Sequence, residues 1–239
     1  MAKGIESHPL LQNLNDMRKI GTLILIVAGM SQFALSQSKV YYTSGLEMIF
    51  SFADVVDHGR DESSLLRWAP VFNFQTFVNA DLGKNFGLFS GLAVRNVGYI
   101  YDNYTDPLSQ VVYKKKFRSY NLGIPIGLKF GDLAGLFVYG GYEVEFPFSY
   151  KEKTFDNGDK INKITGWFSN RQEQFQHGFL VGVQFPDGPN LKFKYYLSEF
   201  HNQGFTDSAG NKPYDGLESH IFYFSLSYMM FRNTDYWGY

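Results

Sequence analysis

The sequence of 239 residues contains no cysteine, which excludes disulfide bonds, thiol nucleophiles, cysteine-ligated metal sites and lipid attachment to an N-terminal cysteine. It also lacks an excess of charge of one sign. Its 22 basic and 23 acidic residues give no electrostatic sign of a nucleic-acid-binding protein. Beyond residue 30 it has no apolar run of about 18 residues or more, so the sequence predicts no transmembrane helix there.

The first 36 residues have the pattern of a secretory signal peptide. Two basic residues, Arg18 and Lys19, precede an apolar run over 20–30, which is followed by a small-x-small cleavage pattern at 34–36. An uncleaved N-terminal anchor is the alternative, but the run is short for a membrane span. Because a second methionine stands directly before the basic pair, residues 1–16 could be an upstream mis-start. The sequence therefore predicts a signal peptide over 1–36, a folded domain over 37–231 and a short tail over 232–239.

The rest of the chain is rich in residues that favour β-sheets and tight turns. Aromatic residues make up 18% of the sequence, with 24 Phe and 17 Tyr, and there are 24 Gly. Alternation with a period of two predicts eight strands of about ten residues or more, long enough to cross a hydrocarbon layer when tilted. These strands lie near 40–53, 65–82, 86–101, 117–130, 135–150, 174–185, 191–200 and 220–231.

Short and long connections alternate between the predicted strands. The short ones are made of turn residues and lie at 83–85, 131–134 and 186–190. The long ones are polar and lie at 54–64, 102–116, 151–173 and 201–219. An up-and-down meander then has all long loops at one end and all short turns at the other. We therefore predict an all-β fold, an eight-stranded antiparallel transmembrane β-barrel of the bacterial outer membrane, with long extracellular loops and short periplasmic turns.

The hairpin over 121–148 indicates which face of the sheet is the inside. Alternate residues such as Leu122 and Ile124 form an apolar face, whereas the opposite face holds Gly123, Pro125 and Gly127. Small residues suit the cramped interior of an eight-stranded barrel, and a continuous apolar exterior would aggregate in water but is required in lipid. A soluble barrel of the lipocalin type, with the faces reversed, is the main alternative.

Two segments, GLAVRNVGYIYD (91–102) and YNLGIPIGLKF (120–130), together with the signal and the eight-strand meander, resemble the small outer-membrane β-barrels grouped with PorT-type proteins. The resemblance covers about 38–231. PorT itself is associated with a secretion system that moves proteins across the outer membrane. The resemblance therefore implies location and fold, and an accessory role in secretion. Its motifs are loose barrel features, so it transfers no functional residues.

Charged residues on the Gly/Pro face are expected to point into the lumen. Counting from the nearest periplasmic turn gives each one an approximate height. One arginine and three glutamates fall near mid-height, and we predict that the arginine is shared among the glutamates because desolvated charges must be paired. The group either fills the barrel as a polar plug or forms a cation or proton path. The predicted cluster is Glu47, Arg95, Glu143 and Glu145, and the charges expected lower in the lumen are Asp81, Lys129, Lys192 and Lys194.

The predicted extracellular loops hold three further candidates. Trp167 and Phe168, on the long loop over 151–173, are candidates for docking a partner, because apolar residues on a polar loop favour contact with another surface. The loop over 54–64 is acidic, but its spacing matches no EF-hand. A Ser/His/carboxylate set near the predicted rim could in principle activate a nucleophile, although nothing in the sequence fixes its geometry. This set comprises Ser198, Glu199, His201, Ser219 and His220.

The sequence thus predicts an outer-membrane barrel with a filled lumen that works through its loops and rim. We expect a non-enzymatic scaffold or accessory component of an envelope or secretion assembly. Its expected partners are outer-membrane lipid and envelope or secretion proteins, with no nucleic acid, cofactor, metal or catalytic residues. The alternatives are a small channel or ligand-binding barrel and, less favoured, a lipid-modifying enzyme at the rim.

Overall fold

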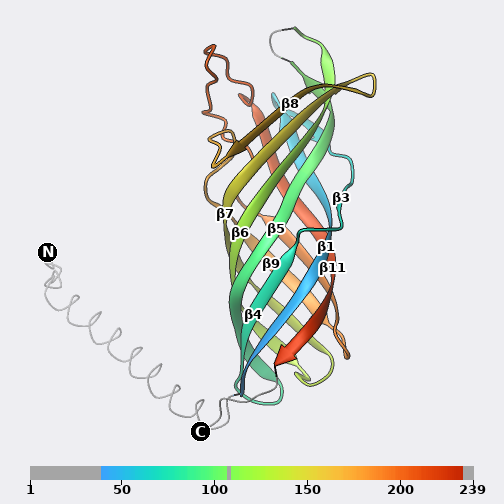
Figure 1. Ribbon diagram of the computed structural model, residues 1–239, viewed down its shortest axis with the longest axis vertical. Coiled ribbons are helices and arrows are strands. Elements are labelled where there is room, and N and C mark those ends of the chain that lie inside the picture. The colour runs from blue at the N-terminus through green and yellow to red at the C-terminus, as the bar shows by residue number, and fades with distance from the viewer. Residues whose placement is uncertain (1–38, 107–108, 234–239) are drawn as a thin grey trace, which may run out of the picture. The chain divides into compact units, whose positions relative to one another are not determined.

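The computed structural model describes residues 39–106 and 109–233. Within them, eleven strands form one antiparallel sheet (Figure 1). The strands are β1 (Lys39–Asp57), β2 (Arg60–Ser63), β3 (Arg67–Ala69), β4 (Phe74–Asp81), β5 (Phe86–Thr105), β6 (Val112–Gly131), β7 (Phe137–Asp156), β8 (Asp159–Trp167), β9 (Gln176–Gln184), β10 (Pro189–Tyr196) and β11 (Leu217–Asn233). No helix in the described ranges is long and apolar enough to cross a membrane.

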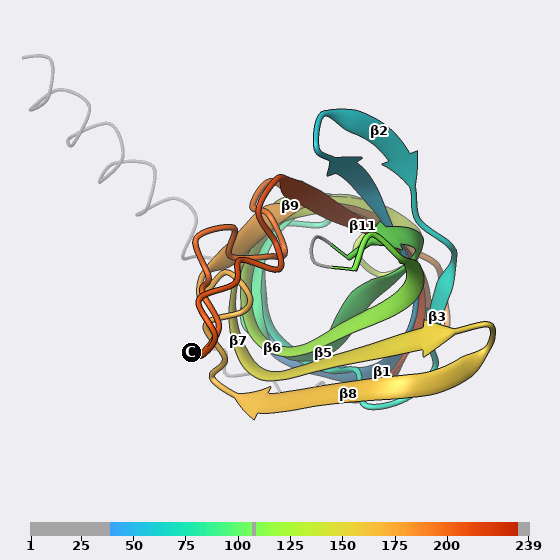
Figure 2. The same cartoon turned by 90° about the horizontal axis from the view of Figure 1, so that it is seen from above.

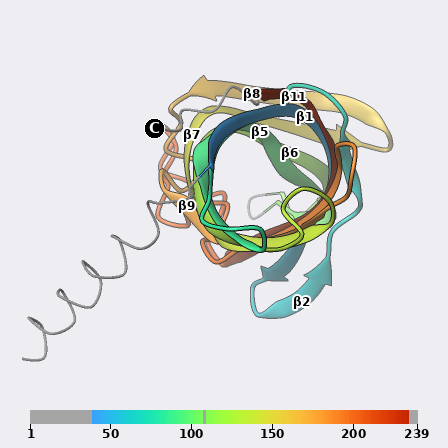
Figure 3. The same ribbon diagram turned by 90° about the horizontal axis from the view of Figure 1, so that it is seen from below.

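Eight of these strands form a closed ring, which confirms the predicted fold class. Their order is β1, β4, β5, β6, β7, β9, β10 and β11, and the ring closes where β11 pairs with β1. Seen from below, the short turns lie around one end of the ring (Figure 3). The predicted signal peptide over 1–36 lies outside the described residues. So does most of the predicted tail over 232–239, although β11 continues to Asn233.

The predicted strand over 65–82 is divided into β3 and β4. Pro70 follows β3 and has no N–H to donate to a ladder, and Phe72 has a positive φ of 63°. The side chain of Asn73 forms hydrogen bonds with two backbone carbonyl groups at this interruption. Its Nδ2 donates to the carbonyl of Ala69 at 2.9 Å and to that of Glu47 at 3.1 Å. The interruption therefore ends pairing without leaving these carbonyls unsatisfied.

Much of what the sequence assigns to long loops is instead ordered strand. The segment over 151–173 contains the β7–β8 hairpin, which turns at Asn157 and Gly158 with φ values of 47° and 93°. Two positive φ angles of this kind are typical of a type I′ turn, for which Asn-Gly is the favoured pair. The segment over 54–64 likewise contains the β1–β2 hairpin. Figure 2 shows β8 alongside β7 outside the ring and β2 projecting from another side.

The two faces of the ring strands are divided as the sequence predicts. In β6 the residues Asn121, Gly123, Pro125, Gly127 and Lys129 are buried, and the alternate residues face outward. The outward residues of the ring form an apolar belt that only a lipid environment tolerates. The chain is therefore an integral outer-membrane β-barrel. The belt includes Leu46, Phe74, Val78, Leu88, Leu92, Leu122, Ile124, Ile126, Leu128, Phe130, Val138, Phe146, Phe179, Val181, Leu191, Phe224 and Leu226.

A shift in register between β6 and β7 changes which residues of β7 face inward. Tyr120 pairs with Ser149, but the next residue, Asn121, pairs with Pro147. Below this bulge the odd-numbered residues of β7 are buried, and above it the even-numbered ones are, starting with Tyr150. A bulge of this kind re-aims the side chains beyond it. It places Glu152 inside the upper barrel and turns the neighbouring lysines outward.

Candidate functional site

An ion cluster crosses the lumen at mid-height. Arg95 of β5 forms ion pairs with Glu47 of β1 and with two carboxylates of β7, Glu143 at 3.0 Å and Glu145 at 3.5 Å. The side chains of all four are fully buried. The structure therefore brings together the four residues that the sequence places in one cluster.

Two lysines of β10 complete the cluster. The Nζ atom of Lys194 lies 2.7 Å from Glu143 and 2.6 Å from Glu145, and that of Lys192 lies 2.6 Å from Glu47. Their expected position lower in the lumen is wrong, because counting residues from a turn ignores the stagger of tilted strands. Three carboxylates thus meet three cations, which compensates the burial of every charge.

Gly123 of β6 makes room for this cluster. A Cβ atom at this position would lie 2.5 Å from Oε1 of Glu143. At Gly140 of β7, by contrast, the nearest atom to such a Cβ would be the carbonyl oxygen of Leu180 at 3.6 Å, an ordinary contact. The small residue at 123 is therefore a requirement of packing against a buried charge.

Replacing Gly123 with alanine is expected to destabilise the barrel, whereas Gly140→Ala serves as a matched control with little effect. Crowding a packed interior costs about 1–3 kcal/mol, and here the atom that must move is a carboxylate held by two cations. Urea unfolding of the refolded barrel in detergent, followed by tryptophan fluorescence, measures the difference. Equal unfolding midpoints for the two variants would contradict the assigned role of Gly123.

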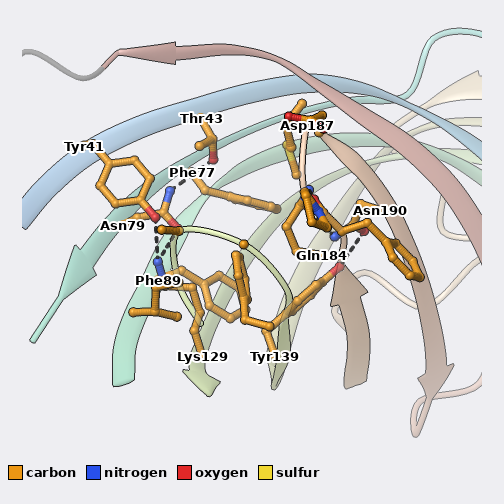
Figure 4. A pocket seen from close by; sticks show the side chains of 18 residues that line it. Tyr41, Thr43, Phe77, Asn79, Phe89, Lys129, Tyr139, Gln184, Asp187 and Asn190 are labelled. Carbon is orange, nitrogen blue, oxygen red and sulfur yellow. Dashed lines mark hydrogen bonds between the residues drawn. The ribbon is translucent and has the colours of Figure 1, made fainter. Parts of the chain in front are cut away.

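A second pair of charges, Lys129 and Asp81, lies toward the periplasmic turns, as the sequence predicts. The Nζ atom of Lys129 lies 2.6 Å from Oδ1 of Asp81, and it also donates to the hydroxyl of Tyr41 and to Oδ1 of Asn79, both at 3.1 Å. Lys129, Tyr41 and Asn79 border a cavity of about 300 Å³ (Figure 4). On the other side of the cavity, the hydroxyl of Tyr139 donates a hydrogen bond to Oδ1 of Asn190 at 2.8 Å. The remaining walls of the cavity are mostly apolar and include Phe77, Phe89 and Phe137.

An aromatic layer fills the barrel above the ion cluster. The carboxylate of Glu152 lies within this layer. It is 2.6 Å from the Nζ atom of Lys115, and it accepts hydrogen bonds from the hydroxyls of Tyr150 at 3.0 Å and Tyr214 at 2.6 Å. Tyr214 belongs to the connection between β10 and β11, so this loop is bonded into the mouth of the barrel. The buried members include Tyr99, Tyr101, Tyr104, Phe117, Tyr150, Tyr196, Phe200, Tyr214 and Tyr223.

His201 joins the same layer as a neutral ring. Its Nε2 lies 2.9 Å from the hydroxyl of Tyr99, and its ring stacks on Tyr214 at a centroid distance of 4.4 Å. Burial away from water lowers the pKa of His201 to about 3. When the loop opens, its imidazole regains a pKa near 6.5. The closed loop is therefore fully stabilised above about pH 6.5 and loses stability as the pH falls toward 3.

We accordingly expect the loop over 197–216 to become more sensitive to protease at pH 5 than at pH 7. In His201→Gln this extra sensitivity should be largely lost, because no buried imidazole then takes up a proton. His58→Gln is the control, since His58 is exposed, and it should behave as the wild type. Cleavage by proteinase K, normalised to an unfolded substrate at each pH, is the measurement. The same pH dependence in all three proteins would contradict the mechanism.

The two docking candidates lie on the outer surface at the end of β8. Trp167 and Phe168 are 73% and 69% exposed. Trp167 stacks on Phe148, which stacks in turn on Tyr120, at centroid distances of 6.1 and 6.2 Å. This aromatic girdle, formed by Tyr120, Phe148 and Trp167, follows the upper edge of the apolar belt, where such rings mark the boundary between lipid and water. Docking by Trp167 and Phe168 stays a prediction.

The structure does not assemble the rim residues into a nucleophilic set. The hydroxyl of Ser198 accepts the backbone N–H of His177 at 3.0 Å, and His220 stacks on Tyr195. His201 is engaged with Tyr99 as described above. In the acidic loop, Asp57 accepts a hydrogen bond from Tyr101 at 2.9 Å. Across 39–106 and 109–233, no three His, Asp or Glu side chains are arranged to hold a metal ion.

Comparison with known proteins finds similar structures but no matching family model or curated sequence. One similar structure is that of Ail, the attachment invasion locus protein of Yersinia pestis, in complex with the heparin analogue sucrose octasulfate. Its sequence is 12% identical to this chain and the TM-score is 0.38. The match covers 82% of this chain and 99% of Ail. Neisserial surface protein A is 14% identical with a TM-score of 0.31, covering 81% and 99%.

OprG of Pseudomonas aeruginosa, an outer-membrane protein, is 10% identical with a TM-score of 0.33, and the match covers 81% of this chain and 96% of OprG. These similarities extend over nearly the whole length of each small barrel. The closed ring of eight strands and its apolar belt establish the same architecture independently of them. The chain described here is an outer-membrane β-barrel protein.

Proposed function

We propose that the protein is a non-enzymatic scaffold or accessory component of an envelope or protein-secretion assembly. The observation that carries this proposal is the filled lumen. The ion cluster at mid-height is fully buried, and the aromatic layer above it includes Tyr99, Phe117 and Tyr214 with no exposed surface. A solute path along the barrel axis would expose these side chains to water. A barrel of this kind would interact with its partners through its rim and its extracellular hairpins.

Two further features support a docking role. Two extracellular segments, the β1–β2 and β7–β8 hairpins, are ordered, so they present a preformed surface that costs little entropy to bind. Trp167 and Phe168 expose large apolar area on one of these hairpins, and aromatic anchors of this kind often dominate interface energetics. The resemblance of 91–102 and 120–130 to PorT-type barrels favours a secretion assembly as the setting.

A filled lumen predicts that the purified barrel does not conduct ions. Reconstituted into planar bilayers, it should give currents no greater than those of protein-free membranes at moderate voltage. Arg95, Glu143 and Lys194 would have to separate before ions could pass, and breaking a buried ion pair costs about 3–5 kcal/mol. Reproducible unitary currents would contradict the proposal and favour the channel alternative.

The docking role is tested by comparing two double variants. Trp167→Ser with Phe168→Ser removes the exposed aromatic pair, and Leu65→Ser with Leu66→Ser removes a matched exposed apolar pair elsewhere on the extracellular side. We expect an envelope protein to co-purify in mild detergent with the wild type and the leucine variant, and its recovery to fall several-fold with the aromatic variant. Recovery of the wild-type barrel alone would count against the proposal.

Binding of a small ligand is a second candidate, favoured by the cavity near the periplasmic turns. Its volume of about 300 Å³ and its mixture of aromatic walls with Lys129, Asn79 and Asn190 suit a compact, partly polar molecule. Native mass spectrometry of the gently purified protein should then show a bound small molecule. A Thr43→Phe variant, which fills the cavity, should lose that mass.

A further inference from the structure

Basic side chains gather on the outer face of β6, β7 and β8, above the aromatic girdle. They lie directly opposite one another in the ladder instead of alternating with acids. Lys116 pairs with Lys153, which pairs on its other side with Lys163, and one rung lower Arg118 pairs with Lys151. With Arg67 nearby, they form what we call the outer basic face: Arg67, Lys116, Arg118, Lys151, Lys153 and Lys163.

The outer basic face lies at the height of lipid headgroups. Arg118 stands two residues above Tyr120 on the same strand face, a step of about 7 Å, and its guanidinium carbon is 4.8 Å from the centre of the Tyr120 ring. Lys116 and Lys153 lie one step higher. Because the girdle marks the boundary between lipid and water, these charges are just outside the hydrocarbon layer.

This arrangement leaves the positive charges uncompensated within the protein. Like charges directly opposite in a sheet are destabilising. Within the part of the chain that the structure describes, none of the six side chains forms an ion pair with a carboxylate. The Nε atom of Arg118 is buried and has no hydrogen-bond partner.

Five of these six residues, all except Lys163, line a hollow in the outer surface. It has a volume of about 230 Å³ and is bordered by Arg67, Trp68, Lys116, Arg118, Lys151 and Lys153. Guanidinium and ammonium groups converging on one hollow are the donors that recognise phosphate. The hollow opens outward, on the face that continues below into the apolar belt through Leu122 and Phe146.

We propose that the outer basic face binds the phosphate groups of a phosphorylated glycolipid in the outer leaflet, of the lipid A type. The phosphates neutralise the opposed lysines and satisfy Arg118, and the acyl chains of the same molecule lie against the apolar belt below. A soluble polyanion offers no group for that belt, which is why a lipid is the ligand. The proposal requires only the membrane barrel and is independent of any scaffold role.

The test compares Arg118→Gln with Lys151→Gln, made together, against the wild type in neutral detergent micelles. The probes are diphosphoryl lipid A, lipid A with both phosphates removed, and inorganic phosphate. We expect the wild type to bind diphosphoryl lipid A at least tenfold more tightly than the double variant, since each charge-assisted contact contributes roughly tenfold. The lipid without phosphates should bind both proteins equally. Lys84→Gln with Lys212→Gln, a pair of lysines outside the outer basic face, should match the wild type.

Thermal unfolding separates binding from a structural role. Without lipid A, the double variant should unfold at the same temperature as the wild type or higher, because opposed positive charges have been removed. Added diphosphoryl lipid A should raise the midpoint of the wild type but not that of the variant. Equal affinities, or a lipid-free midpoint below that of the wild type, would overturn the proposal. Displacement of lipid A by micromolar inorganic phosphate would overturn it in favour of a soluble phosphate site.

Discussion

Replacing Arg95 with methionine is expected to cause the largest loss of stability of any single substitution considered. Methionine fills a similar volume but leaves Glu47, Glu143 and Glu145 facing only the two lysines of β10. Removing one partner of a buried ion pair costs about 3–5 kcal/mol, a large part of the stability of a typical domain. We expect the variant to refold poorly or to unfold at a much lower urea concentration.

The decisive measurement is a double-mutant cycle. Glu143→Gln restores the balance of charge when Arg95→Met is present, but upsets it when Arg95 is intact. We therefore expect the double variant to be more stable than the sum of the single losses predicts. Arg60→Met, at an exposed arginine of β2, controls for loss of an arginine as such. Additive losses would show that Arg95 stabilises the barrel by packing and not by charge.

The second large effect is expected from Glu152→Gln. This substitution keeps the shape of the side chain but leaves the ammonium of Lys115 buried without its counter-charge, and it weakens the acceptor that holds Tyr214. A cost of about 3–5 kcal/mol corresponds to a hundredfold or greater rise in the opening equilibrium of the upper layer. The ion cluster lies below this layer, so the loss should be local.

Hydrogen exchange measures this opening directly. Amides of the loop over 197–216 should exchange at least a hundredfold faster in Glu152→Gln, while those of β6 below Asn121 stay protected. Glu62→Gln, on the exposed β2 strand, should leave both regions unchanged. If the loop keeps its wild-type exchange rates, then Glu152 does not hold the loop in the mouth of the barrel.

The architecture could be predicted from the sequence because it depends on patterns that local residues carry. A period of two over long segments predicts strands, and alternate short and long connections predict a meander. The small residues Gly123, Pro125 and Gly127 identify the lumen-facing side of the sheet, because they fit a narrow interior. The opposite face is apolar, and such a face is stable on the outside of a barrel only when it contacts lipid. The mid-height cluster around Arg95 followed from the same alternation, since each member lies on an inward face.

The inward position of Glu152 and the heights of Lys192 and Lys194 could not be predicted. They depend on where the in-and-out alternation of side chains is interrupted and on how the strands are staggered, and a single sequence shows neither. The bulge opposite Tyr120 adds one residue to β7, so strict alternation from Glu143 places Glu152 on the wrong face. The heights of Lys192 and Lys194 depend on strand stagger, which the turns alone do not define. The Asn-Gly turn at 157–158, by contrast, was a readable signal for the β7–β8 hairpin.

The ion cluster also has a consequence for how the barrel is built. Its members come from the first strand, from the middle of the chain and from the penultimate ring strand, β10. A partly assembled barrel would carry uncompensated charge into the hydrocarbon layer, at a cost of several kcal/mol per ion. We therefore expect insertion and closure to be coupled, because only the closed barrel brings these charges together and neutralises them.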